Sequence, residues 1–292
     1  MLSPPRAYLS LDWIDQQKFP LIHQIIFGRV EKSLADELAD NPGAVHEKDA
    51  MGRTALDWAT ARAQLTDMTL LIKHGSEVNT MDKEGRTTIL HAVDSHNHDA
   101  VRIILEAGGK PNPIVPPGLH RSSPLIAAST GCLKETMELL LEHGAKVDAC
   151  NPEGRTALQA VAIASATQSG TCANILLSHG ADPYDISRNG HSALTMAIIY
   201  NNHAVLKAFI ERCDARPGQG LHLLSHIATS ADADTMSILA GSDLFKQGEY
   251  NADCSENLRD AVQQRTDYDE RLNSVFEELL GQVRVLRKPS AG

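Results

Sequence analysis

A five-residue phrase recurs along this chain at a nearly constant interval. It reads Gly-Arg-Thr-Ala-Leu at 52–56 and 154–158, Gly-Arg-Thr-Thr-Ile at 85–89 and Gly-His-Ser-Ala-Leu at 190–194, with a weaker copy, Arg-Ser-Ser-Pro-Leu, at 121–125. The five start positions are separated by 33, 36, 33 and 36 residues. A period of this length indicates stacked supersecondary units in place of one globular core. It also favours binding over catalysis as the function.

Each position of the phrase has a physical reason. The first residue is Gly in four copies, and Gly permits the positive φ of a tight turn. The Thr or Ser two residues later can cap a helix N-terminus with its hydroxyl, and Pro124 falls at the first helical position, where its missing N–H does no harm. An apolar triplet for a second helix follows, and then a Gly that suits a left-handed C-terminal cap. His74, His143 and His179 stand just before that Gly, and their recurrence at one phase predicts a structural role.

A hairpin, a helix, a turn and a second helix that repeat at about 33 residues resemble the ankyrin repeat. The resemblance implies an all-α fold, an ankyrin-repeat solenoid of helix-turn-helix units with β-hairpin loops and a C-terminal capping helical segment. We expect an N-terminal arm over 1–18, the repeat array over 19–250, and capping helices with a tail over 251–292. The array begins with a degenerate first unit, continues with five clear units from about 49, 82, 118, 151 and 187, and ends with an eroded helix pair at about 221–240. Two three-residue insertions, within 110–121 and near 165–171, account for the 36-residue steps.

The C-terminal segment carries its own helix pattern. Thr266 and Asp269 fit a capping box, with Thr266 as the N-cap. An amphipathic stripe follows, made of Leu272, Val275, Phe276, Leu279, Leu280 and Val283. One interpretation is a cap laid over the last repeat, since a solenoid must cover its end units. The other is a dimerisation or partner helix, so we expect a monomer with dimerisation through this helix as the alternative.

The amino-acid sequences of several repeats are similar to those of filamentous-fungal ankyrin proteins. The similar segments are Gly-Arg-Thr-Ala-Leu-Asp-Trp-Ala (52–59), His-Ala-Val-Asp-Ser-His (91–96), Ile-Ile-Tyr-Asn-Asn-His (198–203) and Asp-Tyr-Asp-Glu-Arg-Leu (267–272). This resemblance bears on the fold more than on the function. Some proteins of that group carry an additional N-terminal domain, and we expect none here because the chain starts almost at the first repeat.

Composition excludes several function classes. The formal net charge is −10 and no dense basic run exists, which argues against binding of nucleic acid through phosphate contacts. The five cysteines are scattered and include no Cys-x-x-Cys pair, as in a reduced cytoplasmic or nuclear protein. No signal peptide is recognisable, and no apolar run approaches the ~18 residues of a membrane span. We therefore expect neither a nucleic-acid nor a membrane partner, and a cytoplasmic or nuclear location.

Candidate chemistry is sparse. The densest group of potential ligands is His91, Asp94, His96, His98 and Asp99, but a metal site needs ligands that converge from more than one element. The sequence contains no Gly-x-Ser-x-Gly, Gly-x-x-x-x-Gly-Lys-Ser/Thr, His-Glu-x-x-His or Gly-x-Gly-x-x-Gly motif. We therefore assign no catalytic residue, no metal site and no cofactor, and the question of an enzyme stays open, with the pattern leaning against it.

The resemblance to ankyrin proteins implies protein–protein recognition, as a scaffold or regulatory adaptor that binds another protein. Such arrays usually bind partners on an extended concave surface lined by hairpins and first helices. The residues that we expect to contact a partner lie at hairpin tips and exposed first-helix positions: Met51, Arg53, Trp58, Arg62, Met81, Lys83, Glu84, His91, Ser95 and Arg155.

Three questions stay open at this level. Asp57-Trp58 departs from the usual repeat, which has His where Asp57 stands, and Trp58 either anchors a partner or packs between helices. The Pro-rich loop 111–120 is either an insertion that determines specificity or one without a role in binding.

The alternative function is a small-molecule-binding protein or unconventional enzyme of a fungal biosynthetic pathway, with a pocket on the concave face. A third hypothesis is a regulatory segment whose catalytic or DNA-binding partner is encoded separately.

Overall fold

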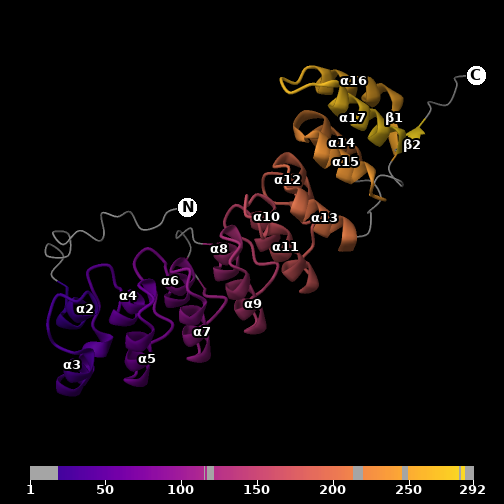
Figure 1. Cartoon of the computed structure of the whole chain (residues 1–292). Helices are drawn as coiled ribbons and strands as arrows, with labels where there is room; N and C mark the ends of the chain where they lie inside the picture. The colour runs from indigo at the N-terminus through magenta and orange to yellow at the C-terminus, as the bar shows by residue number, and fades with distance from the viewer. Residues whose placement is uncertain are drawn as a thin grey trace, which may run out of the picture. The chain divides into compact units, whose positions relative to one another are not determined.

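The computed structural model describes residues 19–114, 116, 122–212, 220–244, 249–282 and 284–286. The chain forms two compact units. Unit 1 comprises the residues up to 152 apart from 129–132, and unit 2 comprises 129–132 and the residues from 153 onward. The expected N-terminal arm, 1–18, lies outside the described residues. Each unit is built from successive antiparallel helix pairs (Figure 1).

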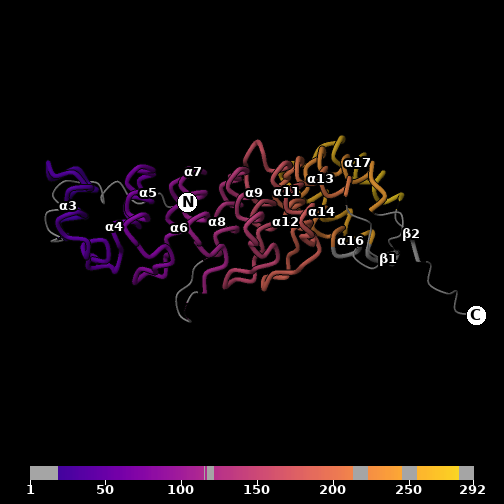
Figure 2. Tube along the Cα trace, turned by 90° about the horizontal axis from the view of Figure 1, so that it is seen from below, coloured from indigo at the N-terminus to yellow at the C-terminus, as the bar shows by residue number. Residues whose placement is uncertain are grey.

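The described part of unit 1 contains four helix pairs and one short 3₁₀ helix. They are α2 (Leu21–Ile26) with α3 (Leu34–Asp40) and η2 (Pro42–His46), α4 (Ala55–Ala61) with α5 (Leu65–Lys73), α6 (Thr88–Asp94) with α7 (His98–Glu106), and α8 (Pro124–Thr130) with α9 (Lys134–Glu142). The last two residues of α8, 129 and 130, group with unit 2. First helices pack on first helices, as α4 does on α6, and second helices α5, α7 and α9 pack in succession (Figure 2). The core between the two rows is aliphatic; its fully buried side chains include Ile22, Leu56, Met68, Leu71, Ile104, Met137 and Leu140.

Unit 2 continues the same helix-pair plan. Its elements are α10 (Ala157–Ala162) with α11 (Ser169–Ser178), α12 (Ala193–Ile199) with α13 (His203–Arg212), α14 (Gly220–Ser230) with α15 (Ala233–Ala240), β1 (Glu249–Asn251), α16 (Ala252–Gln263), α17 (Glu270–Gln282) and β2 (Arg284–Leu286). α10 packs on α12 and α12 on α14, while α11 packs on α13 and α13 on α15. β1 and β2 form a parallel two-stranded sheet, with Tyr250 opposite Val285. No pattern in the sequence predicts this sheet.

The repeated phrase starts the first helices as its chemistry predicts, with one exception. The hydroxyls of Thr54, Thr156 and Ser192 each accept a hydrogen bond from the backbone N–H three residues later. Such a cap satisfies one of the free N–H groups of a helix N-terminus and stabilises it by about 1 kcal/mol. Thr87 occupies the same position before α6, but its hydroxyl caps nothing. In the second copy, the hydroxyl therefore does not make the capping contact that the phrase allows.

The glycines of the phrase and of the helix ends have positive φ, as predicted. This holds for Gly52, Gly85, Gly154 and Gly190 in the turns and for Gly75, Gly108, Gly144 and Gly180 after the second helices. At Gly154 the close approach matters as well, because a Cβ there would lie 3.0 Å from the backbone nitrogen of Arg188 in the next hairpin. The His before the closing Gly is structural in two units: the Nδ1 of His143 and of His179 donates to the carbonyl four residues earlier, at 2.8 and 2.9 Å.

Two of the expected hairpins, both in unit 1, are tight turns that a single antiparallel bridge closes. Within the described part of the loops, these bridges pair Lys48 with Thr54 and Met81 with Thr87. The predicted insertion near 165–171 is present, since six residues (163–168) separate α10 from α11, whereas three (200–202) separate α12 from α13. The other insertion falls partly on 115 and 117–121, which lie outside the described residues.

The C-terminal helices pack on the last repeat pair. α16 packs against α14 and α17 against α15, and Leu272, Phe276, Leu279 and Leu280 of α17 are buried. The helix start differs from the prediction: α17 begins at Glu270, and the carboxylate of Asp269 accepts from the N–H of Leu272. The cap is therefore Asp269 itself, because the chain at Thr266 is still in the turn before the helix. No described helix is both long enough and apolar enough to cross a bilayer.

Candidate partner-binding surface

Two buried aspartates shape the hairpins of unit 1. Oδ1 of Asp49 accepts hydrogen bonds from the backbone N–H groups of Met51 and Arg53, at 2.8 and 2.9 Å. Asp82, one repeat later, binds Glu84 N and Arg86 N in the same way, at 2.9 Å each. Each carboxylate satisfies two N–H groups of its turn, so the turn conformation is fixed from inside. Both aspartates precede the phrase Gly by three residues, a signal that was present in the sequence and was not used.

The two hairpins are tied to each other. The backbone N–H of Lys83 donates to the carbonyl of Met51 at 2.9 Å. The Nε of Arg53 donates to Oδ2 of Asp82, also at 2.9 Å, and the Arg53 side chain is only 13% exposed. Since the Asp82 carboxylate is fully buried, this ion pair orders the second hairpin against the first. We name the exposed face of residues 48–54 and 81–87 the hairpin surface.

Charged side chains continue this network across the hairpin surface. Glu84 lies 3.6 Å from a guanidinium nitrogen of Arg53 and 3.5 Å from one of Arg86, and Arg86 reaches Asp94 at 3.3 Å. These partly exposed pairs are each worth no more than about 1 kcal/mol. Arg53 and Glu84, which we expected to contact a partner, are thus engaged within the molecule, whereas the Lys83 side chain is exposed at the tip.

Trp58 packs within the molecule. Its ring meets Phe19 and Phe27 edge-on, at centroid distances of 5.9 and 5.1 Å. Its Nε1 donates to Oδ2 of Asp49 at 2.9 Å, and the Arg53 guanidinium lies 5.1 Å from the ring centroid. An aromatic cluster of this kind stabilises the first helix pair against the second. The geometry therefore supports the packing interpretation of Trp58 over a free anchor. Arg62 is exposed beside this cluster, 6.0 Å from the ring of Phe27.

His91 occupies the position of Trp58 one repeat later and is buried. Its Nε2 lies 3.7 Å from Oδ2 of Asp82. Burial lowers the pKa of His91 below the usual value of 6.5, against the opposing attraction of Asp57 and Asp82. Ser95, at the end of the same helix, is half-buried and donates to the carbonyl of Ala92. Neither side chain stands free at the hairpin surface.

Asp57 links neighbouring repeats from inside. Its carboxylate accepts hydrogen bonds from the hydroxyls of Thr80 and Thr88 in the next repeat, the shortest at 2.7 Å. It also accepts from the N–H and hydroxyl of Thr54, at 2.9 and 3.0 Å. A buried carboxylate is tolerated only with such partners. The departure from His at this position is therefore explained by packing between repeats.

The predicted contact residues separate into two groups. Met51 and Met81 are half-buried on the hairpin surface, and Lys83 and Arg62 are exposed; Arg53, Trp58, Glu84, His91 and Ser95 have internal roles. Arg155 lies on a hairpin of unit 2 and is half-buried. Within the residues that the structure describes, no group of three or more His, Cys, Asp or Glu side chains is placed to hold a metal ion.

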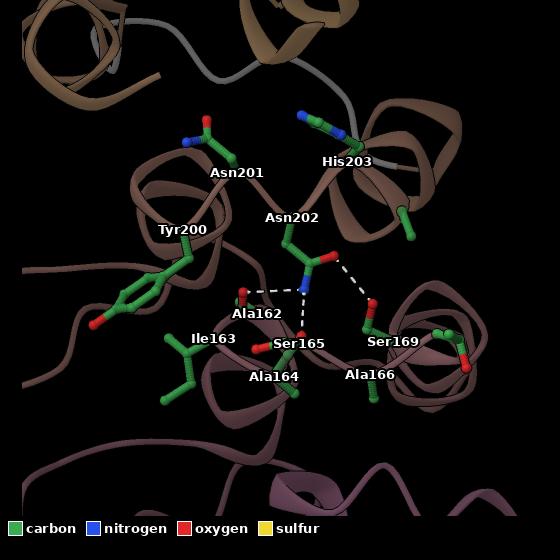
Figure 3. A pocket seen from close by; sticks show the side chains of 12 residues that line it. Ala162, Ile163, Ala164, Ser165, Ala166, Ser169, Tyr200, Asn201, Asn202 and His203 are labelled. Atoms are coloured by element: carbon green, nitrogen blue, oxygen red, sulfur yellow. Dashed lines mark hydrogen bonds between the residues drawn. The ribbon is translucent and has the colours of Figure 1, made fainter. Parts of the chain in front are cut away.

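Unit 2 contains a cleft of about 390 Å³ between the inserted turn of α10–α11 and the turn of α12–α13 (Figure 3). Asn202 fixes the two turns: its amide nitrogen donates to the carbonyls of Ala162 and Ala164, and its oxygen accepts from Ser169. Tyr200 stands at the edge and is 62% exposed. The cleft lies at the interhelix turns, whereas the sequence suggested a pocket on the concave face.

His203 borders this cleft but points away from its hydroxyls (Figure 3). Its Nε2 lies 3.0 Å from Oδ1 of Asp232, the cap of α15. Burial raises the pKa of Asp232, but hydrogen bonds from Thr235 and His203 outweigh burial and hold this pKa below the usual 3.8. The pair therefore connects two helix pairs, and the imidazole is not aligned with Ser169 as a base would be for a nucleophile.

Comparison with known proteins places the repeats in a family. A family model described as ankyrin repeats (3 copies) matches residues 22–115 and 114–187, together more than half of the 292 residues. Among solved structures, a chain from the complex of a predatory endopeptidase of Bdellovibrio bacteriovorus with an immunity protein is similar over 65% of this chain and 95% of that chain. The TM-score is 0.56 and the identity 22%, so this likeness concerns the fold alone. Both findings confirm the predicted all-α repeat fold.

Proposed function

Because the chain belongs to the ankyrin-repeat family, we propose that it is a scaffold or regulatory adaptor that binds another protein through the hairpin surface of unit 1. The observation that supports this proposal is that hydrogen bonds within the molecule hold the hairpin surface in one conformation. Asp49 and Asp82 hold the two turns, and a backbone hydrogen bond joins Met51 to Lys83. A surface ordered in advance loses little conformational entropy when a partner binds.

The side chains left for a partner are those without an internal role. Met51 and Met81 supply adaptable apolar area, and the exposed Lys83 supplies a positive charge next to them. The solved structure of similar fold comes from a complex of two proteins, which agrees with a role in recognition. We further propose, from the wording of the repeats and the scattered cysteines, a filamentous-fungal origin and a cytoplasmic or nuclear location.

Proximity labelling with the full chain tests this function. A labelling enzyme is fused to wild type, to a Met51→Asp, Lys83→Glu double variant and to Lys73→Glu as a matched control. Lys73 is exposed at the end of α5, away from the hairpins. We expect a set of proteins that is enriched with wild type and with Lys73→Glu but lost with the double variant. Equal enrichment in all three would contradict the proposal.

A small-molecule site in unit 2 is a second candidate. The cleft bordered by Tyr200 has a volume of about 390 Å³, within the range of roughly 300–1,000 Å³ that is usual for ligand pockets. Fragment screening by ligand-observed NMR, with Tyr200→Ala as the comparison, would test it. Fragments that bind wild type and lose binding in the variant would support this site, and fragments that bind both equally would exclude it.

A further inference from the structure

Thr87 is the one described Thr or Ser of the Gly-initiated phrases whose hydroxyl does not cap its helix. The other three copies use this hydroxyl on the helix that follows. In the second copy Thr87 is only 5% exposed, and its Oγ1 has no hydrogen-bond partner among the described residues. A buried hydroxyl without a partner is destabilising, because it has lost its hydrogen bonds to water. The structure therefore holds a hydrogen-bond donor that the fold does not use.

This threonine lines a small cleft of unit 1. The cleft has a volume of about 210 Å³ and lies between the second hairpin and the start of the Pro-rich loop. Its apolar wall is made of Val78, Met81, Ile89, Pro113 and Ile114. The last of these is 91% exposed, so the apolar wall of the cleft is partly open to solvent.

The edges of the cleft are held in place by two asparagines in equivalent positions. Asn79 donates to the carbonyl of Gly108 and accepts from Lys110 N, at 3.0 and 2.8 Å. Asn112 makes the same pair of hydrogen bonds to Gly144 O and Lys146 N, at 2.8 and 2.9 Å. Both amides are thereby satisfied. Among the residues that line the cleft, Thr87 has a buried hydroxyl without a hydrogen-bond partner in the described structure, and the Lys110 side chain is exposed.

We propose that this cleft receives one aliphatic side chain from an extended segment of a partner protein, with an acidic residue of the same segment paired to Lys110. The Thr87 hydroxyl donates to a backbone carbonyl of that segment, which it reaches by moving to another staggered rotamer. The inference rests on the proposed function and assigns it one anchoring point.

Size and charge together select this occupant. A volume of about 210 Å³ is below the roughly 300 Å³ at which pockets for small-molecule ligands begin, but it accommodates a single Leu- or Ile-sized side chain. Burial of such a side chain is worth roughly tenfold to a hundredfold in affinity. A carboxylate beside Lys110 completes the contact, because a hydrogen-bonded ion pair at the rim adds specificity in orientation.

Selection from a phage-displayed library of random 12-residue peptides against the full chain tests the assignment. Selected peptides are synthesised, and their affinity is measured by fluorescence anisotropy for wild type, Thr87→Val, Lys110→Glu and Lys146→Glu. Lys146 is the matched control, since its backbone occupies the equivalent position one repeat later. Thr87→Val keeps the shape and removes only a hydroxyl that caps nothing.

We expect the selected peptides to share an aliphatic residue next to an acidic one. Their affinity should fall at least about tenfold with Lys110→Glu, severalfold with Thr87→Val, and not at all with Lys146→Glu. Failure to select such peptides, or equal affinity for all four proteins, would overturn the assignment. If labelled partners are lost with the Met51→Asp, Lys83→Glu double variant but kept with Lys110→Glu and Thr87→Val, the proposed function stands and the cleft is not its anchor.

Discussion

At the scale of single residues, the same position of the repeat makes different hydrogen bonds in different copies. The third residue of the first helix is Asp57 in one repeat and Gln159 in another. Asp57 binds two threonine hydroxyls of the next repeat, whereas Gln159 donates to the carbonyls of Asp185 and His191. Both join consecutive repeats with a satisfied polar contact, so the identity of the residue follows from what the next repeat offers.

The hydroxyls of the phrase give a direct comparison of stability. Thr156→Val removes a capping hydrogen bond and should lower the free energy of unfolding by about 1 kcal/mol. Thr87→Val removes a buried hydroxyl that has no partner in the described structure, so it should leave stability unchanged or raise it slightly. Urea unfolding monitored by circular dichroism measures both. An equal loss in the two variants would show that the Thr87 hydroxyl is in use.

Two buried histidines predict a pH dependence. Burial lowers the pKa of His23, whose Nε2 contacts the carbonyl of Arg53, and of His91. The folded state then binds fewer protons than the unfolded state below about pH 6.5. The contribution of each histidine to the free energy of unfolding is therefore fully present above pH 6.5. It falls as the pH drops from 6.5 toward the lowered pKa of the folded state, by at most ~1.4 kcal/mol per pH unit for each histidine.

Unfolding curves in urea between pH 7.5 and 5.0 measure this dependence. His23→Gln keeps a donor for the Arg53 carbonyl and removes the titrating ring, so its stability should change less steeply with pH than that of wild type. A slope as steep as that of wild type would mean that His23 does not contribute to the acid sensitivity.

Sequence alone identified part of the residue-level picture. Gly, cap and core positions of the phrase were predictable, because each satisfies a local backbone requirement. The contacts of Trp58 and Arg53 were not predictable, since they include partners about thirty residues away in the sequence, Phe27 for Trp58 and Asp82 for Arg53. The unused hydroxyl of Thr87 does have a local signal: the residue three positions later is Asp57, Gln159 or Thr195 in the capped copies, but the apolar Leu90 after Thr87.

At the scale of elements, local sequence signals predicted most of the helices. They did not predict the strands, which form only through contacts between distant parts of the chain. The paired helices and the longer turn between α10 and α11 were predicted from spacing. The β1–β2 pair joins residues more than thirty positions apart, and short strands without an alternating pattern give no periodic signal. The start of α17 shifted to Glu270 because Asp269 competes with Thr266 as a cap.

The apolar stripe of α17 is used within the chain. Phe276 is fully buried and α17 packs on α15. Phe276→Ala should therefore destabilise unit 2 by about 3–5 kcal/mol, with no change in the mass measured by light scattering before unfolding. Urea unfolding and light scattering of the same sample give the two readings. A halved mass with unchanged stability would instead identify α17 as a dimerisation helix.

At the scale of the whole molecule, each compact unit is a row of helix pairs that contact their immediate neighbours. α4 packs on α6, and α10 packs on α12. In such arrays energetic effects spread mainly to adjacent repeats. The hairpin surface and the cleft beside Thr87 both lie in unit 1, so binding there should order the first repeats of the chain most.

Hydrogen–deuterium exchange of the full chain, alone and with a partner recovered by labelling, tests the central claim most directly. Binding through the hairpin surface should slow exchange in residues 48–54 and 81–87, where it removes solvent from the turns, and leave the exposed ends of α5 and α7 unchanged. Protection confined to α5 and α7, with the hairpins exchanging as in the free protein, would contradict the account.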